Sequence, residues 1–115
     1  MNTIEHKGYP AVVGFEREGD NGVFTARAIG IRDLILAEGE SAKELVKEYR
    51  AAIDEYLVDC KNLGREPQKP ASGHFQVRIA PVLHARAKAI AEARAEKTSM
   101  NDIVTEALER MVGTP

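Results

Sequence analysis

An eleven-residue stretch near the middle of the chain constrains the fold most, because neither a helix nor a strand runs easily through it. From Leu63 to Gly73 it contains two prolines, two glycines and five polar or charged residues. Proline removes a backbone donor and glycine loosens the backbone, so such a stretch indicates a linker. We expect two modules, at residues 1–64 and 74–115, joined by a linker at residues 65–73. In a chain of 115 residues, at least one of two such modules needs a partner for stability.

The first module shows strand patterns followed by a helix pattern. Three segments are rich in β-forming residues, namely Tyr9 to Phe15, Val23 to Ile29 and Leu34 to Glu38. Between the first two, Asp20-Asn21-Gly22 predicts a hairpin turn with positive φ angles. The expected order is therefore three strands and then a helix.

The helix of this module is predicted from its start signal and its apolar stripe. Ser41 and Glu44 have the spacing of a capping box, and Gly64 is placed to end the helix. The stripe at helical spacing consists of Leu45, Tyr49, Ala52, Ile53, Tyr56, Leu57 and Cys60. One such helix packed on a three-stranded sheet makes a small α+β layer, and Cys60 is expected to be a buried small side chain rather than a nucleophile.

The second module has the order strand, helix, helix. His74 to Ile79 alternates strictly between polar and apolar residues, and Pro81 suits the first turn of a helix. Ser99, with Asp102 three residues later, predicts the start of a last helix.

A lone strand in a module of about 40 residues has two problems, since it has no pairing partner and the module is too small to be stable alone. A second copy solves both problems. The two strands would pair antiparallel across a two-fold axis, and the apolar faces of four helices would close over them. The expected dimer core is formed by Phe75, Val77, Ile79, Val104 and Leu108. The sequence leaves open whether two dimers pair into a tetramer.

The charge differs between the two halves of the chain. Residues 1–70 carry 10 Lys and Arg against 13 Asp and Glu, whereas residues 71–115 carry 6 against 5. The second half is only faintly basic, so binding to nucleic acid would depend on a few well-placed cations and backbone donors, doubled by symmetry.

The outward face of the expected two-stranded ribbon would present His74, Gln76 and Arg78 twice. Such a ribbon fits the major groove of DNA, where Arg pairs with guanine and Gln with adenine. The segment resembles the ribbon-helix-helix family of DNA-binding proteins. The resemblance implies that Gln76 and Arg78, with His74 beside them, read bases. It also implies that Thr98, Ser99 and Met100 bind a DNA phosphate at a helix N-terminus. The competing interpretation is an ordinary solvated strand face and an ordinary helix cap.

The chain as a whole resembles the HicB antitoxin family. The likeness lies in Gly30 to Ser41, in the helix from Leu45 to Leu57, and in Pro70 to Ile79. It implies a partial RNase H-like N-terminal domain that binds a HicA-type mRNA-cleaving toxin. It also implies a C-terminal ribbon-helix-helix domain that binds the operator of its own operon. One departure is that Ala80 and Val82 flank Pro81, where the family more often has a second proline and an acidic residue.

We expect no enzymatic activity and no cofactor or metal. A two-metal nuclease needs carboxylates that converge, and those at Asp20, Asp33, Glu38 and Glu40 do not show such a pattern. The three histidines are too scattered for a metal site. The single cysteine fits a reducing compartment, and neither a signal peptide nor a membrane span is evident, so we expect a cytoplasmic protein.

Two alternatives stay open at this stage. One is a free-standing ribbon-helix-helix regulator whose N-terminal module binds a small ligand or another protein. The other is a nuclease, active or degenerate, in the N-terminal module.

Overall fold

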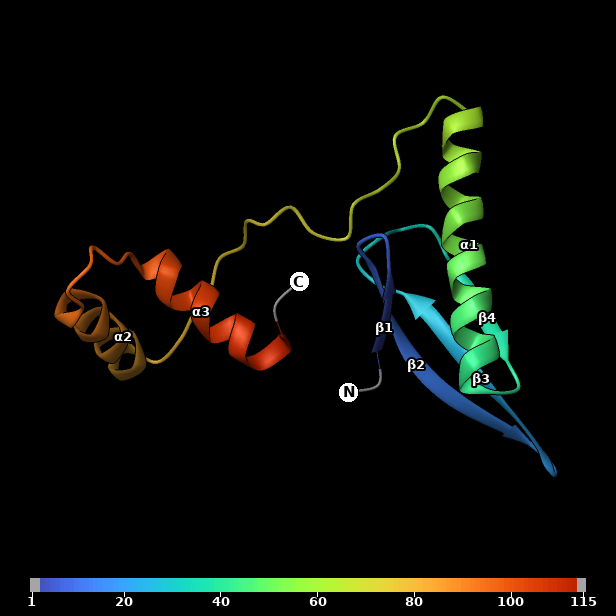
Figure 1. Cartoon of the computed structure of the whole chain (residues 1–115), viewed down its shortest axis with the longest axis horizontal. Coiled ribbons are helices and arrows are strands. Elements are labelled where there is room, and N and C mark those ends of the chain that lie inside the picture. Colours follow the sequence, from blue (N-terminus) through green and yellow to red (C-terminus); the bar gives the residue numbers. More distant parts are fainter. Residues whose placement is uncertain (1–2, 114–115) are drawn as a thin grey trace. The chain divides into compact units, whose positions relative to one another are not determined.

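The computed structural model describes residues 3–113 and divides the chain into two compact units, between His74 and Phe75 (Figure 1). The N-terminal unit contains β1 (Thr3–His6), β2 (Tyr9–Glu18), β3 (Asn21–Ala28), β4 (Leu36–Gly39) and α1 (Ala42–Asn62). The C-terminal unit contains α2 (Pro81–Ala93) and α3 (Met100–Val112). The α+β class is as expected, with a four-stranded antiparallel sheet in place of the three strands predicted.

The additional strand is β1, which pairs with β2 at the edge of the sheet. The two strands are joined by Lys7-Gly8, and both residues have positive φ angles, 50° and 83°, as a type I′ turn requires. His6 and Tyr9 close this hairpin, so the next pair along, Glu5 and Pro10, is of the non-hydrogen-bonded kind. Pro10, which has no N–H, therefore removes no hydrogen bond between β1 and β2.

The turn of the second hairpin lies earlier than predicted. Glu18 pairs with Asn21, so the turn residues are Gly19 and Asp20, while Asn21 and Gly22 belong to β3. Gly19 has a φ of 58° at the first turn position, which is the place where a type II′ turn needs glycine. Gly22 has a different role, because a Cβ there would overlap the ring of Phe15.

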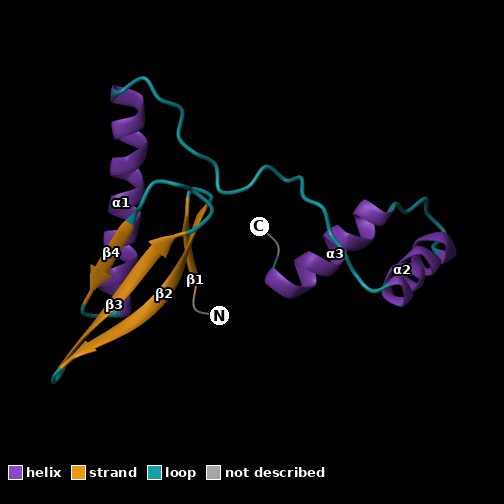
Figure 2. Ribbon diagram, turned by 180° about the vertical axis from the view of Figure 1, so that it is seen from behind, coloured by secondary structure: helices purple, strands orange, loops and turns teal. Residues whose placement is uncertain are grey.

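Helix α1 packs on one face of the sheet, and the core lies between these two layers (Figure 2). The sheet contributes mainly small side chains, which let the helix approach closely. A Cβ on Gly39 would come within 2.5 Å of the backbone nitrogen of Leu45. The Tyr49 hydroxyl donates to the Tyr9 carbonyl at 2.8 Å within this core. The buried cluster consists of Tyr9, Ala11, Ala26, Ala28, Ile35, Ala37, Leu45, Tyr49 and Ile53.

The predicted stripe of α1 is confirmed. Leu45, Tyr49, Ile53 and Cys60 are buried, and the other three members of the stripe are partly buried. The prediction that Cys60 is a buried small side chain is confirmed as well, since it is 3% exposed.

Both ends of α1 carry hydrogen-bonded caps. The Ser41 hydroxyl accepts from the Glu44 N–H at 3.1 Å, which is one of the two bonds of the predicted capping box; the return bond is absent from the described residues. At the other end, Gly64 has a φ of 67° and donates to the Lys61 carbonyl, while Arg65 N–H donates to the Cys60 carbonyl at 2.8 Å. This pair of bonds is a Schellman motif, so Gly64 ends the helix as predicted.

Residues 65–70, which we call the strap, pack against the N-terminal unit, although the sequence predicts a linker there. Gln68 is the centre of these contacts. Its carbonyl accepts from the Tyr9 hydroxyl at 2.6 Å, and its N–H donates to the Tyr56 hydroxyl at 3.0 Å. Its side-chain Oε1 accepts from the Arg32 N–H at 2.6 Å. The strap also lies so close to Gly30 that a Cβ there would come within 2.7 Å of the Pro70 carbonyl oxygen.

The C-terminal unit consists of two helices without the strand predicted at His74 to Ile79. Residues 74–80 lie outside any helix or strand, because a strand is defined by its pairing and one chain offers no partner. Pro81 starts α2 as predicted, and Ala80 before it makes no side-chain cap. Ser99 and Asp102 form a complete capping box at the start of α3.

The C-terminal unit buries no side chain of α2 or α3. Its large apolar side chains are exposed instead, with Phe75 at 68% and Met111 at 75%. Two helices that bury no side chain have little to stabilise them alone. Within residues 3–113, no helix is long and apolar enough to cross a membrane.

Candidate nucleic-acid interface

The predicted base-reading residues lie on an exposed segment at the start of the C-terminal unit. His74, Gln76 and Arg78 are all exposed, as are the residues between them. The His74 N–H donates to the Ser72 hydroxyl at 3.1 Å. Within residues 3–113 Arg78 forms no ion pair, so its guanidinium is free to bind an anion or a base edge.

The predicted phosphate-binding residues form the turn before α3. The Ser99 N–H and its hydroxyl both donate to one carboxylate oxygen of Asp102 at 2.8 Å, and the Thr98 hydroxyl donates to the Glu96 carbonyl at 3.1 Å. Met100 occupies the first helical position, where a backbone N–H has no acceptor within the helix. A phosphate at this turn would therefore bind the Met100 N–H directly and would compete with Asp102 for Ser99.

Asp102 makes this helix start different from a purely positive anion site. Hydrogen bonds from the Ser99 backbone and then from its side chain hold the pKa of Asp102 below its ordinary value. Its carboxylate is therefore charged at neutral pH, where it already satisfies part of the positive end of the helix dipole. Within a single chain, no described hydrogen bond or ion pair joins this turn to residues 74–79.

Ion pairs determine which cations of the C-terminal unit remain free. Glu106 on α3 accepts from Arg94, at the end of α2, at 2.6 Å and from Arg110 at 2.7 Å. The hydrogen bond from Arg94 is the main cause that lowers the pKa of Glu106, and the pKa of Arg94 is raised in turn. Four other cations of this unit form no ion pair within the described residues: Arg78, Arg86, Lys88 and Lys97. The number of charged residues in the sequence does not distinguish the paired cations from the unpaired ones.

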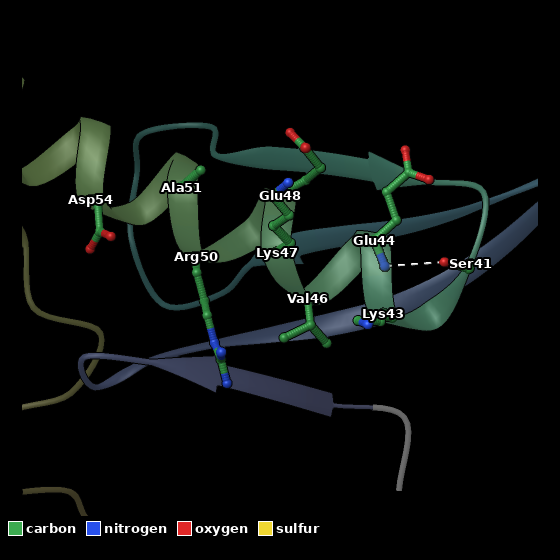
Figure 3. Close-up of a pocket in the computed structure, with 9 residues that line it drawn as sticks. All are labelled: Ser41, Lys43, Glu44, Val46, Lys47, Glu48, Arg50, Ala51 and Asp54. Carbon is green, nitrogen blue, oxygen red and sulfur yellow. Dashed lines mark hydrogen bonds between the residues drawn. The ribbon is translucent and has the colours of Figure 1, made fainter.

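Within its described residues, the N-terminal unit has no comparable chemical site. A shallow hollow on the exposed side of α1 is lined by side chains of both signs, among them Lys43, Lys47, Glu44 and Glu48 (Figure 3). Among residues 3–113, no group of three or more His, Cys, Asp or Glu is placed to hold a metal ion. The expected absence of a nuclease thus remains a prediction.

One ion-pair cluster ties β1 to α1 in this unit. Asp54 accepts from His6 Nε2 at 2.9 Å and from Lys7 Nζ at 2.8 Å. The hydrogen bond from Lys7, followed by that from His6, holds the pKa of Asp54 below its ordinary value. The cluster fastens the edge strand to the helix, and we assign it no chemistry.

The fold and the interface define a class of protein with two parts, an α+β unit that has a core of its own and a two-helix unit whose apolar side chains are exposed. The model of the HicB family matches residues 56–108, from the end of α1 into α3. The match covers 53 of the 115 residues, so it shows a likeness to this family over that part of the chain. No curated protein and no solved structure matches the chain.

Proposed function

We propose that the chain is an antitoxin that neutralises a HicA-type mRNA-cleaving toxin by direct binding and represses its own operon. In this proposal the N-terminal unit is a partial RNase H-like domain that binds the toxin. Residues 74–115 form a ribbon-helix-helix dimer that binds operator DNA. The proposed site of action is the cytoplasm, and no step of the proposal is enzymatic.

The observation that carries this proposal is the lack of a core in the C-terminal unit. Helices α2 and α3 bury no side chain, and Phe75, Val77 and Ile79 at alternating positions before them are exposed. Burial of apolar surface contributes roughly 25 cal/mol per Å², so these side chains favour association with a second copy of the same unit. Pairing of the two segments at residues 74–79 would also provide the partner strand that one chain lacks.

In the proposed dimer the polar positions of the ribbon face away from the helices. Gln76 and Arg78, with His74 beside them, would contact base edges in the major groove. The Met100 N–H, with Ser99 and Thr98 around it, would bind a backbone phosphate and fix the position of the ribbon. The unpaired cations Arg86, Lys88 and Lys97 are available for further phosphate contacts.

Arg78→Ala tests the DNA-binding half of the proposal. The probe is a duplex that covers the DNA directly upstream of this chain's own gene, and binding is measured by fluorescence anisotropy at fixed salt. Loss of an Arg–base contact is expected to weaken the free energy of specific DNA binding by about 1–3 kcal/mol. Arg110→Ala is the matched control, because Arg110 is paired with Glu106 and its loss should leave affinity almost unchanged.

Growth assays test the antitoxin half. Any small protein encoded beside this chain's gene is expressed alone, with the wild-type chain, and with the Arg78→Ala variant. Arrest of growth that both versions of the chain relieve supports neutralisation independent of DNA binding. A harmless neighbour would instead favour a free-standing regulator of transcription.

A further inference from the structure

The sheet of the N-terminal unit has one covered face and one bare face. Helix α1 lies against the face that carries Ala11, Ala26 and Ala37, all buried. Among the described residues of this unit α1 is the only helix, and Figures 1 and 2 show it along one side of the sheet. Side chains alternate between the faces of a strand, so residues adjacent to these alanines point to the other side.

Apolar side chains gather on the bare face. Val12 of β2, Arg27 of β3 and Leu36 of β4 are direct neighbours in the sheet register. Val12 is 44% exposed and Leu36 is 54% exposed.

The apolar side chains continue beyond the end of the ladder. The Ala28 N–H donates to the Ile35 carbonyl, which continues the register of β3 and β4 and places Leu34 opposite Ile29. Both of these residues are exposed as well. We call Val12, Ile29, Leu34 and Leu36 the apolar patch.

Acidic residues surround the apolar patch. Glu5, Glu16 and Glu38 are exposed at strand positions on the same face, and Arg27 is the one cation in these strand rows. The face therefore combines exposed hydrophobic area, which marks interaction sites, with a negative rim. Such a surface suits a protein that presents an apolar patch flanked by Lys and Arg.

The acidic rim argues against two other occupants. A nucleic acid would bring its phosphates against the three carboxylates, which is repulsive. A second copy of the same face would oppose acidic residues to acidic residues around a two-fold axis. In the proposed function a second copy pairs through the C-terminal unit, where the exposed apolar side chains are more numerous.

We propose that the bare face of the sheet, centred on Val12 and Leu36, is the surface on which the toxin docks. This inference rests on the proposed function and adds the surface that performs it. The toxin's own RNA-binding surface, which must be basic to bind phosphates, is the part of a partner that best matches the negative rim. Docking there would cover the groups that the toxin needs for RNA.

The experiment uses the full-length chain and the purified small protein that arrests growth in the growth assay. Val12→Glu and Leu36→Glu place a charge in the apolar patch, whereas Val58→Glu is the matched control. Val58 is 56% exposed on α1, so it offers the same chemistry outside the patch. Glu38→Lys reverses one charge of the rim, and its control is Glu48→Lys on α1. Affinity is measured by calorimetry, and the fold of each variant is checked by circular dichroism and by operator binding.

We expect Val12→Glu and Leu36→Glu to weaken toxin binding at least tenfold, with operator binding and oligomeric mass unchanged. Glu38→Lys should weaken binding several-fold at low salt and less at high salt. Patch variants that bind normally while Val58→Glu fails would overturn the proposal in favour of the α1 face. A lower oligomeric mass of Val12→Glu without toxin would overturn it in favour of a second copy. If even the wild-type chain fails to bind the small protein, the proposed function itself is refuted, and the docking surface with it.

Discussion

Gln68 offers the sharpest test of how the strap is held. Its Oε1 accepts from the Arg32 N–H at 2.6 Å and, weakly, from the Asp33 N–H at 3.4 Å. Gln68→Met keeps the length of the side chain and removes this acceptor. The backbone bonds of residue 68 to Tyr9 and Tyr56 are independent of the side chain and should survive. The variant thus isolates the contact between the strap and the loop at residues 30–33.

The expected magnitude follows from the geometry of the two bonds. A hydrogen bond contributes about 0.5–1.5 kcal/mol net, and Arg32 is exposed, so water replaces part of what is lost. The bond from Asp33 lies at the outer limit of distance and adds little. We expect the substitution to lower the free energy of local opening of the loop by about 1 kcal/mol, which raises the opening equilibrium constant about fivefold.

Hydrogen exchange measured by NMR provides the assay, because it reports the Arg32 amide without unfolding either unit. In Gln68→Met this amide should exchange about fivefold faster than in the wild type. Trypsin should also cleave faster after Arg65, which is paired with Asp33 at 3.2 Å. Gln68→Glu retains an acceptor and should restore protection. An Arg32 amide that exchanges equally fast in wild type and Gln68→Met would refute the idea that the side chain holds the loop.

Two further predictions concern the two units separately. Tyr49→Phe removes the buried bond to the Tyr9 carbonyl and should destabilise the N-terminal unit by about 1 kcal/mol at pH 7, measured by urea denaturation. Burial raises the pKa of Tyr49 to about 12 from 10.0. The stability that the neutral Tyr49 hydroxyl contributes to the folded state is therefore fully present below pH 10 and is lost as the pH rises from 10 to 12. Tyr49→Phe should therefore flatten, in part, the loss of stability over that range, and an unchanged slope would contradict the assignment. Leu108→Glu should convert the proposed dimer to a monomer in sedimentation velocity while Arg110→Ala should not; an unaltered mass for Leu108→Glu would remove Leu108 from the interface.

The helices were predictable from the sequence because their signals are local. The stripe of α1, its end at Gly64 and the Ser99 cap of α3 each depend on residues a few positions apart. Strand β1 was missed because Thr3–His6 is short and its turn, Lys7-Gly8, places a lysine at a positive φ. The second turn was predicted one step late, because Asn21-Gly22 is the commoner turn pair and the close packing of Phe15 on Gly22 is a tertiary effect.

The strap could not be found in the sequence for a different reason. The two prolines and two glycines in residues 63–73 correctly exclude a helix. They do not indicate which groups form hydrogen bonds with the backbone of this segment. Those partners are hydroxyls of Tyr9 and Tyr56 and the loop at Arg32, far away in sequence. The apolar patch was likewise hidden, since a strand's apolar residues do not reveal which face a helix will cover.

The two units differ in what stabilises them, and this difference bears on the proposed function. The N-terminal unit has a core of its own, so its docking surface would persist in a single chain. The C-terminal unit buries no helical side chain alone, so its fold and its DNA binding would depend on protein concentration. Dilution should therefore abolish operator binding before it abolishes toxin binding.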